Sequence, residues 1–492
     1  MFFDGFISLF DDDDWTMSFL DYDDNEDDWM ERGSTGARNY GDMDAAELLN
    51  AAQEGSISID TLEEIAGYHL EKGNFDDALK FLRVLTELTP YSSEAWERTG
   101  MALNNLGQYE RALEAFEQAE RLNPGDIELL INKGITLDNL GKVEQALDYF
   151  DHALALEPEN DEALFSKGIT LEHADKYAEA IGLFTELVRR DEQNKDAWYE
   201  LGYAHDMENN LDEALRCYDR ALDLAPFNHN AWYNRGIVYN RMGSWRKAIE
   251  SYDFALAIQE DFASAWYNRG NSCANLGDFG EAAECFRKTL EHEPNDPHAW
   301  HNLGNALEEL GNFTQAIQAY DKSIKLAPRN PDSLYGRGSA HEALGDYRAA
   351  LADFHSAAAL APDTIDYWYA KADLEFELGE LGAALDSLAH ILKLEPGNAA
   401  VWIDVAEISF EAELYEQSID ACEQALALGD RLPEALYFLV QALHATGRVE
   451  EALVAYKRYL VLAADGKDSE GQTLPDIPLF RRLRRQLEQE GG

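Results

Sequence analysis

The sequence predicts an all-α solenoid, in which short helix pairs stack along one chain. The first observation is a fixed period: Ala231-Trp-Tyr-Asn-Arg-Gly returns as Ala265-Trp-Tyr-Asn-Arg-Gly, and Trp232 and Trp266 are 34 positions apart. The second is a small residue four positions after each Trp slot, and the third is a small residue sixteen positions after it. A repeat of this length is one supersecondary unit, which buries its apolar face only by stacking on its neighbours.

The period runs without an insertion through twelve repeats, from Ile59 to Gly466. The Trp slot contains Leu62, Trp96, Leu130, Leu164, Trp198, Trp232, Trp266, Trp300, Leu334, Trp368, Trp402 and Leu436. The slot four residues later contains Ala66, Gly100, Gly134, Gly168, Gly202, Gly236, Gly270, Gly304, Gly338, Ala372, Ala406 and Val440. Eight repeats close with proline: Pro90, Pro124, Pro158, Pro226, Pro294, Pro328, Pro362 and Pro396.

Each slot has a physical role. In the sixth repeat, Trp232, Gly236 and Tyr239 share one face of a helix predicted near residues 229–242. Gly236 has no side chain, so the second helix can approach it closely. This pattern resembles the W-x2-L-G-x2-Y, A-x3-F and P signature of the tetratricopeptide repeat (TPR) family. The resemblance implies a superhelix whose first helices line a concave groove.

The flanking segments differ in composition from the repeats. Residues 1–41 form an acidic-aromatic tail, and through Ser58 the chain has 16 acidic and 2 basic residues. Such charge density predicts disorder. Acidic-hydrophobic alternation is also typical of segments that fold onto a partner, and docking of the aromatics on the chain's own solenoid is the alternative. Residues 42–58 are expected to form a capping helix, started by Asp42 or Asp44 and stopped by Gly55.

The C-terminal segment, residues 467–492, reads as a linker followed by a basic amphipathic helix. Leu479, Phe480, Leu483 and Leu487 form the apolar stripe, and four arginines surround it. The favoured interpretation is an end-cap with its apolar side on the twelfth repeat and its arginines in solvent. The alternative is a basic helix for an acidic partner, including another copy of this chain.

The whole-chain charge and the cysteines limit the partners. The formal net charge is −55, so free nucleic acid and anionic membranes are poor partners, and a basic protein segment or a saline cytoplasm would suit it. Four cysteines without a Cys-x-x-Cys pair suggest buried thiols in a reducing compartment. No basic residue precedes Arg32 and no apolar run is long enough to span a membrane. We therefore expect a cytoplasmic protein.

No catalytic signature is present in the sequence. We find no Gly-rich phosphate loop, no nucleophile elbow and no zinc spacing. His298 and His301 share a helical face, yet a metal site would need a third ligand that is not evident. We therefore expect no enzyme activity, no cofactor and no metal.

Binding is the remaining class of function. In TPR folds the residues one, two and five positions after the Trp slot face the groove, and here the middle repeats are rich in Asn and Tyr. This resembles the asparagine array in the TPR superhelix of O-linked N-acetylglucosamine transferases, which implies that amides grip a peptide backbone. The alternative is that Tyr-Asn is simply frequent in TPR helices. The predicted groove residues are Tyr199, Tyr233, Asn234, Tyr267, Asn268, Asn271, His301, Asn302, Asn305 and Tyr335.

Toward both ends the same slots become acidic. We expect Glu200, Asp206, Asp373 and Glu407 to steer a partner by charge. The predicted function is therefore a non-catalytic scaffold or adaptor, which binds an extended or helical segment of a protein partner with basic flanks. The alternative is homotypic assembly or partner storage through the ends and tails. The oligomeric state is left open.

Overall fold

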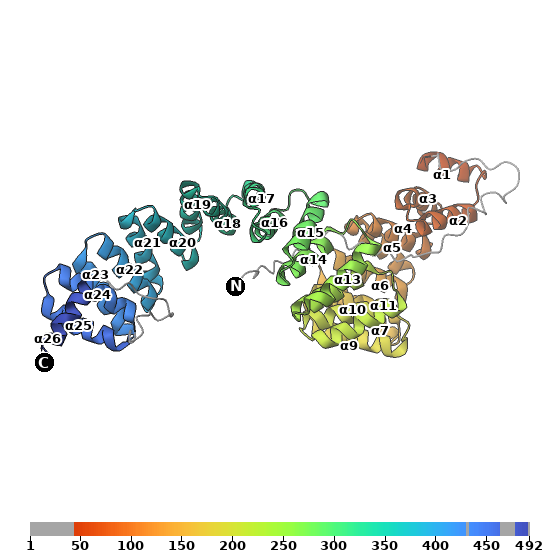
Figure 1. Ribbon diagram of the computed structural model, residues 1–492. Coiled ribbons are helices and arrows are strands. Elements are labelled where there is room, and N and C mark those ends of the chain that lie inside the picture. The colour runs from red at the N-terminus through yellow and green to blue at the C-terminus, as the bar shows by residue number, and fades with distance from the viewer. Residues whose placement is uncertain (1–43, 430–431, 463–477, 491–492) are drawn as a thin grey trace. The chain divides into compact units, whose positions relative to one another are not determined.

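The repeats fold into helix pairs, as the period predicts. The computed structural model describes residues 44–429, 432–462 and 478–490, and this part of the chain contains 26 α-helices (Figure 1). The acidic-aromatic tail at residues 1–41 and the linker at residues 467–477 lie outside the described residues, so the predicted disorder of the tail stays a prediction.

Two alternating helix types make up the repeats. The first helices are α2 (Ile59–Glu71), α4 (Ser93–Asn105), α6 (Ile127–Asn139), α8 (Asp161–His173), α10 (Lys195–Met207), α12 (His229–Arg241), α14 (Ala263–Asn275), α16 (Pro297–Glu309), α18 (Pro331–Ala343), α20 (Ile365–Glu377), α22 (Ala399–Glu411) and α24 (Pro433–Ala445). The second helices are α3 (Phe75–Leu88), α5 (Tyr109–Leu122), α7 (Val143–Leu156), α9 (Tyr177–Arg190), α11 (Leu211–Leu224), α13 (Trp245–Ile258), α15 (Phe279–His292), α17 (Phe313–Leu326), α19 (Tyr347–Leu360), α21 (Leu381–Leu394), α23 (Tyr415–Leu428) and α25 (Val449–Leu462).

The 34-residue period is the sum of four fixed lengths. Each first helix has 13 residues and each second helix has 14, and a three-residue turn and a four-residue connection complete the repeat. Every turn passes through one residue with positive φ, a conformation that glycine adopts without steric cost. This residue is Gly73, Gly107, Gly141, Asp175, Asn209, Gly243, Gly277, Gly311, Gly345, Gly379, Glu413 or Gly447.

The contacts divide the chain into two units, residues 1–238 and 239–492, and the division falls inside α12. In the first unit, α4 and α5, α6 and α7, and α10 and α11 pack as pairs, and α3, α5, α7 and α9 also contact the next first helix. The second unit repeats the pairing in α14 and α15, α16 and α17, α18 and α19, and α22 and α23. Each unit is thus built from stacked helix pairs.

The glycine four residues after the Trp slot accommodates a buried ring. A Cβ atom on Gly168 would lie 2.6 Å from Cε1 of Phe184, and one on Gly304 would lie 2.5 Å from Cε1 of Tyr320. Both rings are fully buried and lie sixteen positions after their glycine. Where the slot is alanine, as at Ala372 and Ala406, the residue sixteen positions later is smaller, Leu388 or Cys422. Two slots of one repeat thus share a limited volume.

The tryptophans hold the connection before their own helix. The indole Nε1 of Trp300 donates to the backbone carbonyl of Pro294 at 3.0 Å, and Trp232 does the same to Pro226 at 2.9 Å. Equivalent bonds are made by Trp96, Trp198, Trp266, Trp368 and Trp402. The Trp slot therefore does more than bury apolar surface.

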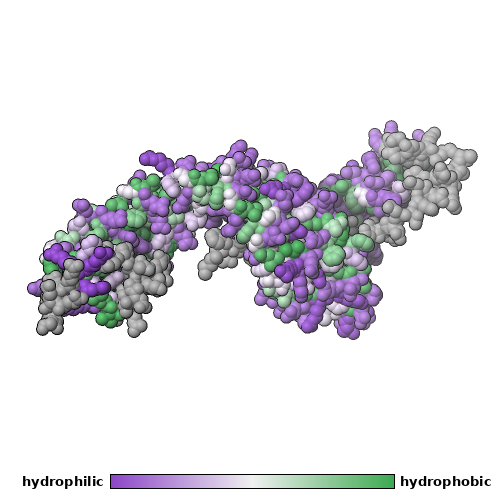
Figure 2. Space-filling view, viewed as in Figure 1, coloured by the Kyte–Doolittle hydropathy of each residue, from purple (hydrophilic) through white to green (hydrophobic). Residues whose placement is uncertain are grey.

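Both ends of the described chain carry a capping helix. α1 (Ala45–Gln53) begins with Asp44, which forms a capping box with Glu47, and it packs on α3 with Leu48 fully buried. Helix α26 (Pro478–Glu490) buries Phe480 against Tyr437, Tyr456 and Tyr459, with ring centroids 5.0–5.3 Å apart. Its Arg481, Arg482 and Arg484 are exposed. On the side shown in Figure 2, hydrophilic residues predominate and apolar ones are scattered among them.

Candidate binding surface on the first helices

The predicted groove residues all lie on first helices. First helices of successive repeats contact one another, in the first unit at α4 and α6, α6 and α8, and α8 and α10. In the second unit the corresponding pairs are α14 and α16, α16 and α18, and α22 and α24. In each unit the slots of neighbouring repeats are thereby close enough for their side chains to interact.

The asparagines form hydrogen bonds to the preceding repeat. In the first unit, Nδ2 of Asn234 donates to the hydroxyl of Tyr199 at 2.9 Å. In the second unit, Nδ2 of Asn302 donates to the hydroxyl of Tyr267 and to Oδ1 of Asn271, both at 3.0 Å. Both Asn–Tyr pairs are 35 residues apart, one more than the period. The Oδ1 atoms of Asn234 and Asn302 accept nothing from the residues that the structure describes.

A longer chain of hydrogen bonds passes through His301. Nδ2 of Asn305 donates to Nε2 of His301, so Nδ1 of His301 carries the proton and donates to Oγ of Ser333, each at 3.0 Å. The hydroxyl of Tyr320 is 2.7 Å from both Oδ1 of Asn305 and Oε2 of Glu308. Burial lowers the pKa of His301 to about 4, so the ring is neutral near pH 7.

The aromatic groove residues rest on the buried rings of the second helices. The ring centroids of Tyr199 and Tyr218 are 5.9 Å apart, and those of Tyr267 and Phe286 are also 5.9 Å apart. The ring centroid of Tyr335 lies 5.5 Å from that of Phe354 and 5.2 Å from that of Tyr367. The other two predicted residues, Tyr233 on α12 and Asn268 on α14, are half-buried. The structure therefore brings most of the predicted residues into side-chain contact within their own unit.

The residues predicted to steer by charge differ in accessibility. Glu200 and Asp206 are only 7% and 6% exposed, whereas Glu407 is half-buried and Asp373 is exposed. Burial and the charge of Asp196 raise the pKa of Glu200, and burial followed by repulsion from Glu377 raises that of Asp373. Glu200 and Asp206 are thus better placed for short-range contact than for long-range attraction.

Most basic residues of the first helices are already paired. Three positions after the Trp slot, Lys167, Arg235 and Arg269 form ion pairs of 2.6–2.7 Å with an aspartate of the preceding second helix. Arg337 does the same with Asp321, and it also binds Asp353. These cations join one repeat to the next.

Two participants were not predicted: Tyr320 and Ser333. Tyr320 occupies a slot that is phenylalanine in five repeats and tyrosine in four, and only its hydroxyl signals a polar partner. Ser333 is fully buried and gave no signal of its own. Glu172 was expected in one of the acidic inward slots, but sequence alone does not show that it is 7% exposed.

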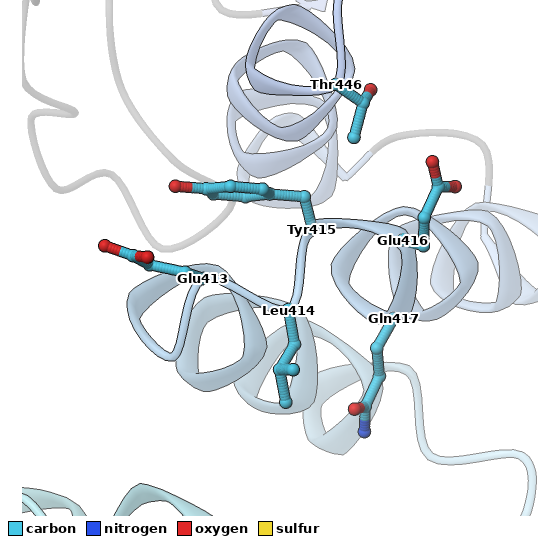
Figure 3. A pocket seen from close by; sticks show the side chains of 6 residues that line it. All are labelled: Glu413, Leu414, Tyr415, Glu416, Gln417 and Thr446. Carbon is cyan, nitrogen blue, oxygen red and sulfur yellow. The ribbon is translucent and has the colours of Figure 1, made fainter.

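No group of three or more His, Cys, Asp or Glu side chains among the described residues could hold a metal ion, and no described helix is long and apolar enough to cross a membrane. A depression of about 330 Å³ lies beside the turn between α22 and α23. Figure 3 shows that its polar side chains, Glu413, Glu416 and Gln417, point in different directions.

Comparisons with solved structures return other repeat proteins. The MamA protein is 28% identical over 34% of this chain and 92% of its own, with a TM-score of 0.33. YrrB, described as a TPR protein with an unusual peptide-binding site, is 22% identical over 38% of this chain and 97% of its own, with a TM-score of 0.36. A tetratricopeptide repeat protein from Parabacteroides merdae is 21% identical over 51% of this chain and 98% of its own, with a TM-score of 0.41. No curated protein sequence matches.

Profiles of the tetratricopeptide repeat family match nearly the whole repeat region. One profile matches residues 64–127, 131–195, 174–229, 267–331, 335–399, 372–433 and 406–469. A second matches residues 229–262. These matches, the 34-residue geometry and the helix pairs agree, and the chain belongs to the tetratricopeptide repeat family.

Proposed function

We propose that the chain is a non-catalytic scaffold that binds an extended or helical segment of a partner protein along its first helices. The observation that carries this proposal is the orientation of the groove amides. Asn234 and Asn302 each donate Nδ2 to a tyrosine of the preceding repeat, which leaves Oδ1 without a donor among the described residues. A peptide segment supplies backbone N–H donors that suit this acceptor.

The acidic slots add a preference for basic flanks. Asp404 is half-buried, and burial, then the nearby Asp373 and Glu407, raise its pKa to about 7. Such carboxyls are destabilised by burial and by one another, so a cationic partner residue would relieve both effects. The negative electrostatic potential of the groove favours a basic segment, and it would repel nucleic acid or anionic lipid.

The test uses the partner captured by crosslinking mass spectrometry on the full chain, followed by titration of the crosslinked partner segment. Replacing Asn234, Asn268 and Asn302 by Ala should weaken binding by about two orders of magnitude, at roughly 1 kcal/mol per lost hydrogen bond. Ser272→Ala is the control, because it removes the inter-repeat hydrogen bond from Oγ of Ser272 to Oδ1 of Asn240 and leaves the groove amides unchanged.

The control separates binding from stability. Ser272→Ala should lower stability by roughly 1 kcal/mol and leave the affinity within about twofold. If the triple variant binds its partner as the wild type does, the amides serve only to join repeats.

A second candidate, assembly between copies, is favoured by one observation. Helix α26 exposes Arg482 and Arg484 on a chain with a net charge of −55, so its basic face complements the acidic surface of another copy. Sedimentation of the wild type and of an Arg482→Glu/Arg484→Glu variant at low salt tests this. Equal sedimentation at all concentrations would rule out this contact.

A further inference from the structure

Glu172 on α8 and Glu200 on α10 are buried carboxyls without a partner. Each residue is 7% exposed. Neither carboxyl group forms a hydrogen bond or ion pair with any residue that the structure describes. Oε1 of Glu172 is completely enclosed and has no donor. The other oxygen of Glu172 and both oxygens of Glu200 still reach solvent, so the pair is accessible from outside.

Two other buried acids of this chain are compensated. Asp353, 6% exposed, receives two hydrogen bonds from Arg337 at 2.8 and 2.6 Å. Glu375, 4% exposed, lies 3.1 Å from Nζ of Lys371 and accepts from Ser387 at 2.6 Å. Glu172 and Glu200 have no such cation among the described residues, and its absence needs an explanation.

The surroundings of the pair are negative and aromatic. Tyr203, half-buried on α10, is close enough to both carboxyls to interact with them electrostatically, and its ring lies 6.2 Å from that of Tyr177. Asp196 repels the charge of Glu200, and Glu200 repels that of Glu172. Burial, as the larger cause, and this repulsion raise the pKa of both glutamates.

Unpaired buried carboxyls destabilise a fold, because desolvation is not repaid by a partner. A cation inserted between them would gain two charge-assisted contacts in a poorly hydrated place. A guanidinium suits the position best, since its planar fork can reach two acceptors and stack on a tyrosine ring.

We propose that Glu172 and Glu200 form the binding position for one cationic side chain, an arginine, of the partner segment. This inference rests on the proposed scaffold function and assigns one contact of it. Glu172 and Glu200 each supply a carboxylate from neighbouring repeats, so the arginine would also fix the register of the segment along the first unit.

The experiment uses the full chain and capped nine-residue Gly/Ser peptides with a central Arg, Lys or citrulline. Citrulline has nearly the shape of arginine but no charge. The Arg peptide should bind best by calorimetry at low salt, and citrulline should abolish binding. Glu172→Gln and Glu200→Gln should each weaken the Arg peptide by about tenfold or more.

The matched control is Glu179→Gln on α9, which removes the same charge from an exposed position and should change the affinity by less than about twofold. Because glutamine keeps the shape of glutamate and removes a carboxyl that burial destabilises, both glutamine variants should also melt at a temperature no lower than that of the wild type.

Two outcomes would overturn this position. One is an Arg peptide that binds the Glu172→Gln and Glu200→Gln variants as tightly as it binds the wild type. The other is a lowered melting temperature in both variants, which would show that the carboxyls stabilise the fold. The scaffold proposal is tested separately, since the asparagine variants leave Glu172 and Glu200 unchanged.

Discussion

The contact between the glycine slot and the buried ring supports a prediction in which two similar substitutions have opposite signs. Gly168 on α8 and Gly182 on α9 belong to the same helix pair. A Cβ atom on Gly168 would lie 2.6 Å from Cε1 and Cζ of Phe184, whereas nothing lies within 4 Å of one on Gly182. Gly168→Ala should therefore destabilise the first unit, and Gly182→Ala should stabilise it.

The magnitudes follow from packing and helix propensity. Carbon atoms in good contact are about 3.5–4.0 Å apart, so the fully buried ring of Phe184 must move by about 1 Å. Such overpacking costs roughly 1–3 kcal/mol. Alanine gains about 0.5–1 kcal/mol over glycine in a helix, and at position 182 this gain is the whole effect. The two variants should differ by roughly 2 kcal/mol.

Urea unfolding with hydrogen exchange resolved by mass spectrometry is the assay, because stability in repeat arrays is local. Exchange should accelerate in α8 and α9 for Gly168→Ala alone. Adding Phe184→Leu recreates the natural Ala372 and Leu388 combination, and it should recover part of the loss as a non-additive effect. If both glycine variants shift stability equally, the ring contact has no energetic role.

Three further predictions concern single positions. Glu413 adopts φ 58° where nine of the twelve turns have glycine, so Glu413→Gly should raise stability in urea unfolding by roughly 0.5–1 kcal/mol, more than Asn209→Gly does. Burial, then repulsion from Glu128 and Asp126, raise the pKa of Glu97 from 4.5 to about 7. The folded state then binds this proton more tightly than the unfolded state, so stability should fall by up to about 1.4 kcal/mol per pH unit as the pH rises between these values. Glu97→Gln should remove this loss from a series of urea melts at different pH. Phe480→Ala should release α26 at a cost of about 3–5 kcal/mol, seen as faster hydrogen exchange in α24 and α25, and unchanged exchange there would show that α26 does not act as a cap.

The helices and their pairing could be predicted because they follow from local rules. A period of 34, glycine at the turn and Asp44 before Ala45 each act within a few residues. The glycine slot was predicted to allow the second helix to approach closely. The structure shows that the glycine makes room for one aromatic ring of that helix, on the residue sixteen positions later. That spacing was visible in the sequence as glycine with Phe or Tyr, and alanine with Leu388 or Cys422.

The candidate site could be predicted only in part. The sequence placed Asn234 and Asn302 on the first helices, but it did not show that Nδ2 is used between repeats and that Oδ1 is left. Hydrogen-bond direction depends on neighbours 35 residues away, such as Tyr199. Likewise, Glu200 and Asp373 occupy similar acidic slots, and only three-dimensional packing makes the first buried and the second exposed.

The indole hydrogen bonds decide where this chain can be cut. A boundary drawn from the sequence period falls at the first residue of a first helix, for example between Asp296 and Pro297. The bond from Trp300 to the carbonyl of Pro294 crosses that boundary. A fragment that begins at Pro297 would leave the indole N–H without its acceptor, whereas one that begins at Glu293 retains it. The four-residue connection thus belongs structurally to the repeat that follows it, and fragments of the array should begin before this connection.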